Sequence, residues 1–132
     1  MGLDMYAHRV KKKLNDVPPF FEDEEAPRYV LNKDPEEFEY WRKHPNLHGW
    51  FKNLYHKKGG KGDFNCIWVE VTLGDLEQLE KDILHDRLPD TEGFFFGKSD
   101  NTERQKEFDL NFVRKARDEI AQGYSIYYEG WW

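Results

Sequence analysis

Cysteine is scarce in this chain, and long apolar runs are missing. The 132 residues include one cysteine, Cys66, so an intrachain disulfide is excluded and a reducing, cytoplasmic location is expected. No apolar run approaches the roughly 18 residues that a membrane-spanning helix requires. The segment after Met1 also lacks the basic and apolar regions of an export signal. We therefore expect a cytoplasmic protein without a membrane anchor.

Positive charge is also in short supply. Lysine and arginine total 20 against 26 aspartates and glutamates, which gives a formal net charge of -6 at pH 7. Because duplex affinity depends on neutralising phosphates with many basic side chains, general nucleic-acid binding is not expected. Charge runs such as the acids at 22–25 are more typical of a solvated face than of a binding site.

Aromatic residues are what the chain has in excess. Ten phenylalanines, seven tyrosines and five tryptophans make up 17% of a sequence whose mean hydropathy is -0.97. Most of them lie in three blocks, at 40–51, 94–96 and 124–132. Large flat side chains bury much area and leave polar tips and irregular concave surfaces. This composition indicates recognition of a ligand or partner, and it identifies no reaction.

Hydrophobic periodicity predicts three strands in one domain that spans residues 1–132. Side chains alternate from Leu3 to Val10, residues 65–71 are rich in β-formers, and 124–131 is a further β-rich run. We expect the first and last strands to pair in one sheet. That pairing would bring the amino-terminal residues beside the aromatic end of the sequence.

Two helices are predicted between the first and second of these strands. Asp34 and Pro35 are typical of a helix start, and we expect this helix to run until Pro45 interrupts it. Apolar spacing then predicts a continuation to about Lys58. The acidic, proline-containing segment at 15–27 is predicted to be a surface loop.

Two more helices are predicted before the last strand. Thr72 and Asp75 have the spacing of a capping box, which predicts a helix ending near Pro89. Asp100 is predicted to cap a longer helix that Gly123 ends. The resulting order, β-α-α-β-α-α-β, predicts an α+β domain with a small, mostly antiparallel sheet of three or more strands covered on one face by helices.

Several blocks of the sequence resemble a family of small uncharacterised phage and bacterial proteins. The blocks are the start MGLDMY, then YWRK with His48 and Trp50-Phe51, then Asn65-Cys66, then GFFFG and the end rich in Tyr and Trp. The resemblance spans nearly the whole chain and implies a phage or prophage origin. Some members carry a phosphoglycerate kinase label, which does not fit here because that enzyme is a much longer, two-domain protein. Members often have Ser before the last Trp, so any role of that serine does not carry over to this chain.

Three motifs suggest chemistry, and each has a structural alternative. The run GKS around Lys98 resembles the end of a phosphate-binding loop, but Glu92 stands where that motif needs glycine. Cys66 could be a nucleophile if a histidine lay beside it, although a cysteine in an apolar strand is usually a core residue. His44 and His48 have the helical spacing of metal ligands, which the intervening proline spoils. We expect no cofactor, no metal site and no catalytic residue.

One constellation mixes charge, hydrogen-bonding tips and flat stacking surfaces. Arg42 could grip a phosphate or a carboxylate, and the aromatic faces could stack on a base or an extended peptide. The candidate ligand-binding residues are Asp4, Tyr6, Arg42, His48, Phe95, Tyr128, Trp131 and Trp132. Arg42 has an alternative partner in Glu39. The aromatic residues Trp41, Trp50, Phe51 and Trp68 are expected in the core.

These features predict a non-enzymatic phage or prophage accessory protein that binds a host protein or a small anionic, nucleotide-like ligand through an aromatic-lined surface. The alternative is a small enzyme acting on a phosphorylated or nucleotide substrate, with Asp4 or His48 as the proton-transfer group and Arg42 as an anion clamp. A deep pocket holding all three residues would favour the enzyme. A flat aromatic patch rimmed by charge would favour the protein binder.

Overall fold

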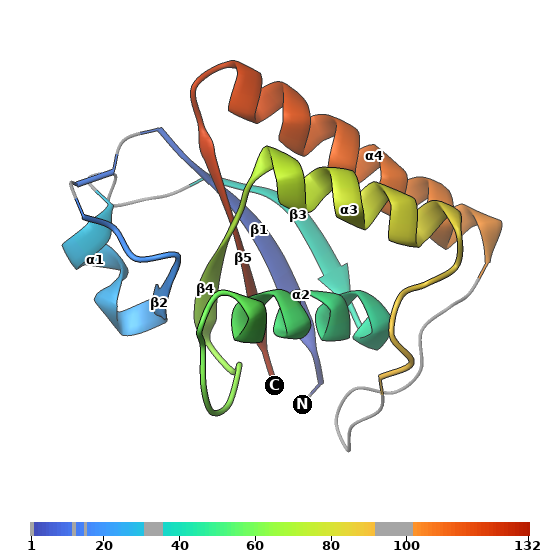
Figure 1. Ribbon diagram of the computed structural model, residues 1–132, viewed down its shortest axis with the longest axis horizontal. Helices are drawn as coiled ribbons and strands as arrows, with labels where there is room; N and C mark the ends of the chain where they lie inside the picture. Colours follow the sequence, from blue (N-terminus) through green and yellow to red (C-terminus); the bar gives the residue numbers. More distant parts are fainter. Residues whose placement is uncertain (1, 12, 15, 31–35, 92–101) are drawn as a thin grey trace.

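The computed structural model describes residues 2–11, 13–14, 16–30, 36–91 and 102–132. Within these ranges the chain forms five strands, four α-helices and one short 3-10 helix (Figure 1). The elements are β1 (Asp4–Val10), β2 (Phe20–Glu22), a 3-10 helix (Asp23–Glu25), α1 (Ala26–Tyr29), β3 (Glu36–Arg42), α2 (Pro45–Lys57), β4 (Ile67–Val71), α3 (Leu73–Leu84), α4 (Glu103–Ala121) and β5 (Ser125–Trp131). No helix in the described part of the chain is long and apolar enough to cross a membrane.

The strands form one antiparallel sheet in the order β2-β4-β5-β1-β3. The predicted α+β class with an antiparallel sheet is therefore confirmed, while the predicted order of elements is not matched. The predicted pairing of the first and last strands is also confirmed, because β1 and β5 pair from Asp4 opposite Trp131 to Val10 opposite Ser125. The two marked chain ends consequently lie close together in Figure 1.

Residues 36–42 form a strand, so the helix predicted there is wrong. Phe38 and Trp41 have helical spacing, but β3 pairs with β1 and sets Trp41 opposite Met5 and Tyr40 opposite Tyr6. Aromatic side chains suit a pleated, half-buried surface, and this long-range pairing decides the structure. The predicted cap at 34–35 lies outside the described residues.

The segment predicted to be a loop at 15–27 contains regular structure, so that prediction is also wrong in part. Phe20 and Phe21 pair with β4 opposite Val69 and Trp68, which anchors β2 at one edge of the sheet. The 3-10 helix and α1 follow, and a proline occupies the first turn of α1, where its missing amide hydrogen costs nothing.

The predicted capping box of the third helix is confirmed. The amide of Asp75 donates to the Thr72 hydroxyl at 3.3 Å, and the Thr72 amide donates to the Asp75 carboxylate at 2.9 Å. This helix, α3, ends at Leu84, a turn earlier than predicted. Thr102 caps α4, whereas the predicted cap Asp100 lies outside the described residues.

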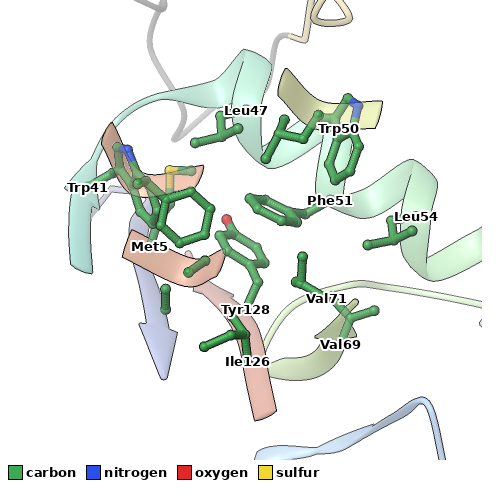
Figure 2. Close-up of a cluster of buried hydrophobic side chains, with 14 of the residues drawn as sticks. Met5, Trp41, Leu47, Trp50, Phe51, Leu54, Val69, Val71, Ile126 and Tyr128 are labelled. Atoms are coloured by element: carbon green, nitrogen blue, oxygen red, sulfur yellow. The ribbon is translucent and has the colours of Figure 1, made fainter. Parts of the chain in front are cut away.

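Helices α2, α3 and α4 pack on one face of the sheet and enclose the main core with residues of β1, β3, β4 and β5 (Figure 1). Figure 2 shows Phe51 of α2 lying against Tyr128 of β5. Their ring centroids are 3.9 Å apart and the ring planes differ by 11°. The expectation that Trp41, Trp50, Phe51 and Trp68 are buried is confirmed. We call this side of the sheet the helix face.

A smaller core lies on the opposite side of the sheet. Phe21 of β2, Ala26 of α1 and Val30, which follows α1, pack with Trp68 of β4 and Tyr127 of β5. This second cluster covers β4 and part of β5. It leaves the β1–β3 end of the same face without a covering element among the described residues.

Candidate functional site

The uncovered part of the sheet carries four of the eight residues predicted to bind a ligand: Asp4, Tyr6, Arg42 and Trp131. Alternate residues of a strand point to opposite faces, so the core positions Met5 and Tyr128 place their neighbours on the other side. The register then brings together five residues from three adjacent strands, which we call the open patch: Asp4, Tyr6, Tyr40, Arg42 and Trp131.

Three rings form an aromatic platform in the open patch. Tyr6 occupies the middle strand, with its centroid 5.3 Å from that of Tyr40 and 5.9 Å from that of Trp131. Both outer rings are well exposed, Tyr40 at 42% and Trp131 at 44%. The tilted and edge contacts hold the rings in place without burying their outer faces. A partner can therefore stack on the platform without displacing any described residue.

Charged groups fix one side of this platform. The Tyr40 hydroxyl donates to Asp4 at 2.6 Å, and Arg42 lies 3.6 Å from the same carboxylate. The hydrogen bond to Asp4 raises the pKa of Tyr40 to about 12. Burial, followed by the charge of Asp4, raises the pKa of Tyr6. The predicted alternative partner of Arg42, Glu39, instead pairs with Lys115.

A buried acid lies beside the platform. Glu129 stands opposite Tyr6 on β5 and is only 3% exposed. One of its oxygens lies 3.1 Å from Nε2 of His8, whose ring stacks on Trp68 at 4.3 Å with planes 4° apart. The other oxygen of Glu129 has no hydrogen-bond partner in the described structure. This arrangement places a largely dehydrated carboxylate next to an accessible aromatic surface.

A groove of about 530 Å³ begins at Trp131 and runs along the turn that precedes β4. Its walls include the acidic residues Glu22, Asp23, Glu24 and Asp63, the single base Lys61, and Cys66. Trp131 contacts Tyr6 and also lines the groove, so it joins the groove to the open patch. We call this cavity the acidic groove.

Three of the predicted site residues lie on the helix face instead. His48 is fully buried in α2 and shares a 2.7 Å hydrogen bond with the Tyr128 hydroxyl. Trp132 packs edge-on against His48 at 4.9 Å. Burial, followed by the charge of Lys52, lowers the pKa of His48 to about 3, so this histidine is neutral in the folded protein. The sheet therefore separates these residues from Asp4 and Arg42.

The remaining candidates are Phe95, the GKS motif and Cys66. Phe95 and the GKS motif around Lys98 lie outside the described residues. Cys66 is partly exposed in a left-handed turn (φ 59°) and is not the core residue expected. Burial, and then the charge of Glu129, raises the pKa of its thiol, which opposes a reactive thiolate.

A buried acid in α4 was not predicted. Asp109 accepts hydrogen bonds from Trp41 at 3.2 Å and Gln105 at 3.0 Å, and lies 2.7 Å from His44. It ties β3 and the start of α2 to α4 and lines a cavity of about 570 Å³. Asp109 precedes Phe112 by three residues, so helical spacing could have revealed a carboxylate on an apolar face.

No family model, curated protein or solved structure matches the chain. The described residues also contain no group of three or more His, Cys, Asp or Glu side chains that could hold a metal ion. The function is therefore best approached through the open patch, where exposed rings, fixed charges and a buried acid meet.

Proposed function

We propose that this chain is a non-enzymatic phage or prophage accessory protein that binds a bacterial host protein through the open patch. The observation that carries the proposal is the aromatic platform, in which two large rings remain more than 40% exposed on the part of this face that no described element covers. Exposed tyrosine and tryptophan beside an arginine form a combination that is enriched at protein interfaces.

A small nucleotide-like ligand is less well supported than a protein. Arg42 is 55% exposed and could meet a phosphate, but the adjacent Asp4 carboxylate already occupies one side of its guanidinium. Further acids surround the patch, and they would repel an anion. Tyr40 and Trp131 are also more than 40% exposed, whereas a site for a small ligand usually buries most of that ligand.

The described residues do not bring together the groups that the enzymatic alternative needs. It needs His48 or Asp4 to act as a proton-transfer group beside Arg42, yet His48 lies in the core on the helix face. Asp4 does lie beside Arg42, but both side chains are partly exposed, Asp4 at 33% and Arg42 at 55%. These positions favour recognition over proton transfer.

The test is capture of a host protein by immobilised wild-type protein and by Tyr40→Ser/Trp131→Ser. The variant should lose the captured protein, because serine removes both exposed ring faces. Leu73→Ser/Leu84→Ser is the matched control, since these leucines of α3 are 51% and 50% exposed. It should retain the captured protein.

Hydrogen exchange of the complex then locates the interface. Protection should appear in β1, β3 and β5, which carry the open patch. Protection confined to α3 and α4, or equal capture by both double variants, would contradict the proposal.

A further inference from the structure

The residues that line the acidic groove include four acids and one base, so the groove is strongly negative. Glu22, Glu24 and Asp63 are exposed acids on its walls, and Lys61 is the one base among the lining residues. No hydrogen bond or ion pair is found for the side chains of Glu24 and Asp63 with described residues. These carboxylates are therefore available to a cation from outside.

Glu129 gives a second, independent indication that a cationic group binds here. It is 97% buried, and one carboxylate oxygen has no hydrogen-bond partner among the described residues. Glu129 lies opposite Tyr6 of the open patch, and the next residue of β5, Gly130, accepts a hydrogen bond from the amide of Cys66 in the groove wall. A buried carboxylate with an unused acceptor is costly unless a donor reaches it.

Trp131 occupies the junction of these two surfaces. Its ring lies edge-on to Tyr6 with the centroids 5.9 Å apart, and the same residue lines the groove. A guanidinium group stacks on an indole face and donates paired hydrogen bonds to carboxylates. Tryptophan next to several acids therefore favours arginine over any neutral side chain.

This inference rests on the proposed function. We propose that the host partner inserts an extended, arginine-containing segment that crosses Trp131. One arginine stacks on the indole, and others lie in the acidic groove. An extended segment suits the site because the groove continues directly from the platform. Glu129 lies two residues before Trp131 on the same face of β5, so an arginine stacked on the indole lies near this carboxylate.

Other occupants fit the charges poorly. A nucleic-acid strand could stack on the platform, but its phosphates would face Glu22, Glu24 and Asp63 across the groove. An apolar helix would cover the same carboxylates without pairing them, and buried unpaired charges are strongly unfavourable. Charge complementarity therefore selects a cationic segment.

The test uses a fluorescein-labelled decapeptide of alternating arginine and serine, with binding followed by fluorescence anisotropy at low ionic strength. Wild-type protein should bind it. Replacing every arginine with citrulline, which keeps the planar shape but removes the charge, should weaken binding by more than about tenfold. A labelled oligothymidylate of ten nucleotides should not bind.

Protein variants locate the binding surface. Trp131→Ala should weaken peptide binding by about tenfold or more, and Leu84→Ala, at a similarly exposed position on α3, should leave it unchanged. Glu24→Lys/Asp63→Lys should weaken binding by about three- to tenfold. Glu77→Lys/Glu107→Lys, on exposed helix positions, changes the net charge equally and should have a much smaller effect.

Several results would overturn this inference. They are equal binding of the citrulline peptide, preference for the oligothymidylate, or equal loss in the two charge-reversal variants. If the host protein protects β1, β3 and β5 yet binds Glu24→Lys/Asp63→Lys as tightly as wild type, the proposed function stands and the cationic segment is wrong.

Discussion

Tyrosines lie on both faces of the sheet, buried in the core on the helix face and partly exposed in the open patch. On the helix face, Tyr128 is fully buried, stacks on Phe51 and bonds to His48. On the opposite face, Tyr6 and Tyr40 form a platform with outer surfaces open to a partner. Strand alternation makes this difference, because consecutive residues of each strand point to opposite sides of the sheet. Aromatic content alone therefore does not distinguish a core from a binding surface.

Large-to-small substitutions should separate the two faces most clearly. Phe51→Ala removes a fully buried ring and should lower the free energy of unfolding by about 3–5 kcal/mol. Tyr40→Ala removes a ring that is 42% exposed, and should cost about 1 kcal/mol or less. Urea unfolding monitored by circular dichroism measures both. Similar losses in the two variants would contradict the assignment of core and surface.

Gly130 tests how closely the helix face is packed against β5. A Cβ atom at this position would lie 2.7 Å from the His48 ring, so Gly130→Ala should lower the free energy of unfolding by about 1–3 kcal/mol. Gly74→Ala in α3 is the control, because its nearest neighbour would be 3.9 Å away. Thermal unfolding should show a lower Tm for Gly130→Ala and no loss for Gly74→Ala. A normal Tm for Gly130→Ala would mean that His48 is loosely held.

The neutral His48 should make the helix face sensitive to acid. Its pKa is about 3 in the folded protein against an ordinary value of 6.5, so the unfolded chain binds a proton first as the pH falls. The contribution of neutral His48 to the free energy of unfolding is fully present above pH 6.5. It is lost as the pH falls towards 3, with a slope of up to about 1.4 kcal/mol per pH unit. Urea unfolding across this range should show a steeper loss for wild type than for His48→Gln. Parallel curves would show that His48 is solvated in the folded state.

The smallest expected effect lies in the open patch. Tyr40 should ionise with a pKa of about 12, because its hydroxyl donates to Asp4. Asp4→Asn should lower this value towards the ordinary 10 with little change in stability, since the pair is exposed to solvent. Ultraviolet difference titration of wild type, the Asp4 variant and Tyr40→Phe isolates this tyrosine. An unchanged titration in Asp4→Asn would mean that the hydrogen bond does not persist in solution.

Local patterns in the sequence predicted much of the fold. Alternation identified β1, a β-rich run identified β4, and the capping box at Thr72 identified α3. The helix start at Asp34 and Pro35 predicts a helix through residues 36–42. Only the pairing with β1, a contact between distant segments, makes them a strand. Local periodicity cannot reveal that pairing.

The candidate site was predicted in part. Pairing of the first and last strands correctly brought Asp4 and Tyr6 to the Trp131 end. His48 and Trp132 fall on the other face because a helix covers that side and because neighbouring strand residues alternate. Tyr40 was absent from the candidates, since a helical assignment for its segment hid its position opposite Tyr6.

The central position of β5 has a consequence for synthesis on the ribosome. In the order β2-β4-β5-β1-β3, this strand joins two pairs that have no other link within the sheet, yet it comes last among the described elements. Isolated two-stranded ribbons are marginally stable in water. Until β5 emerges, β1 and β4 lack the strand that pairs with both of them. The five-stranded sheet should therefore form cooperatively only after β5 is available.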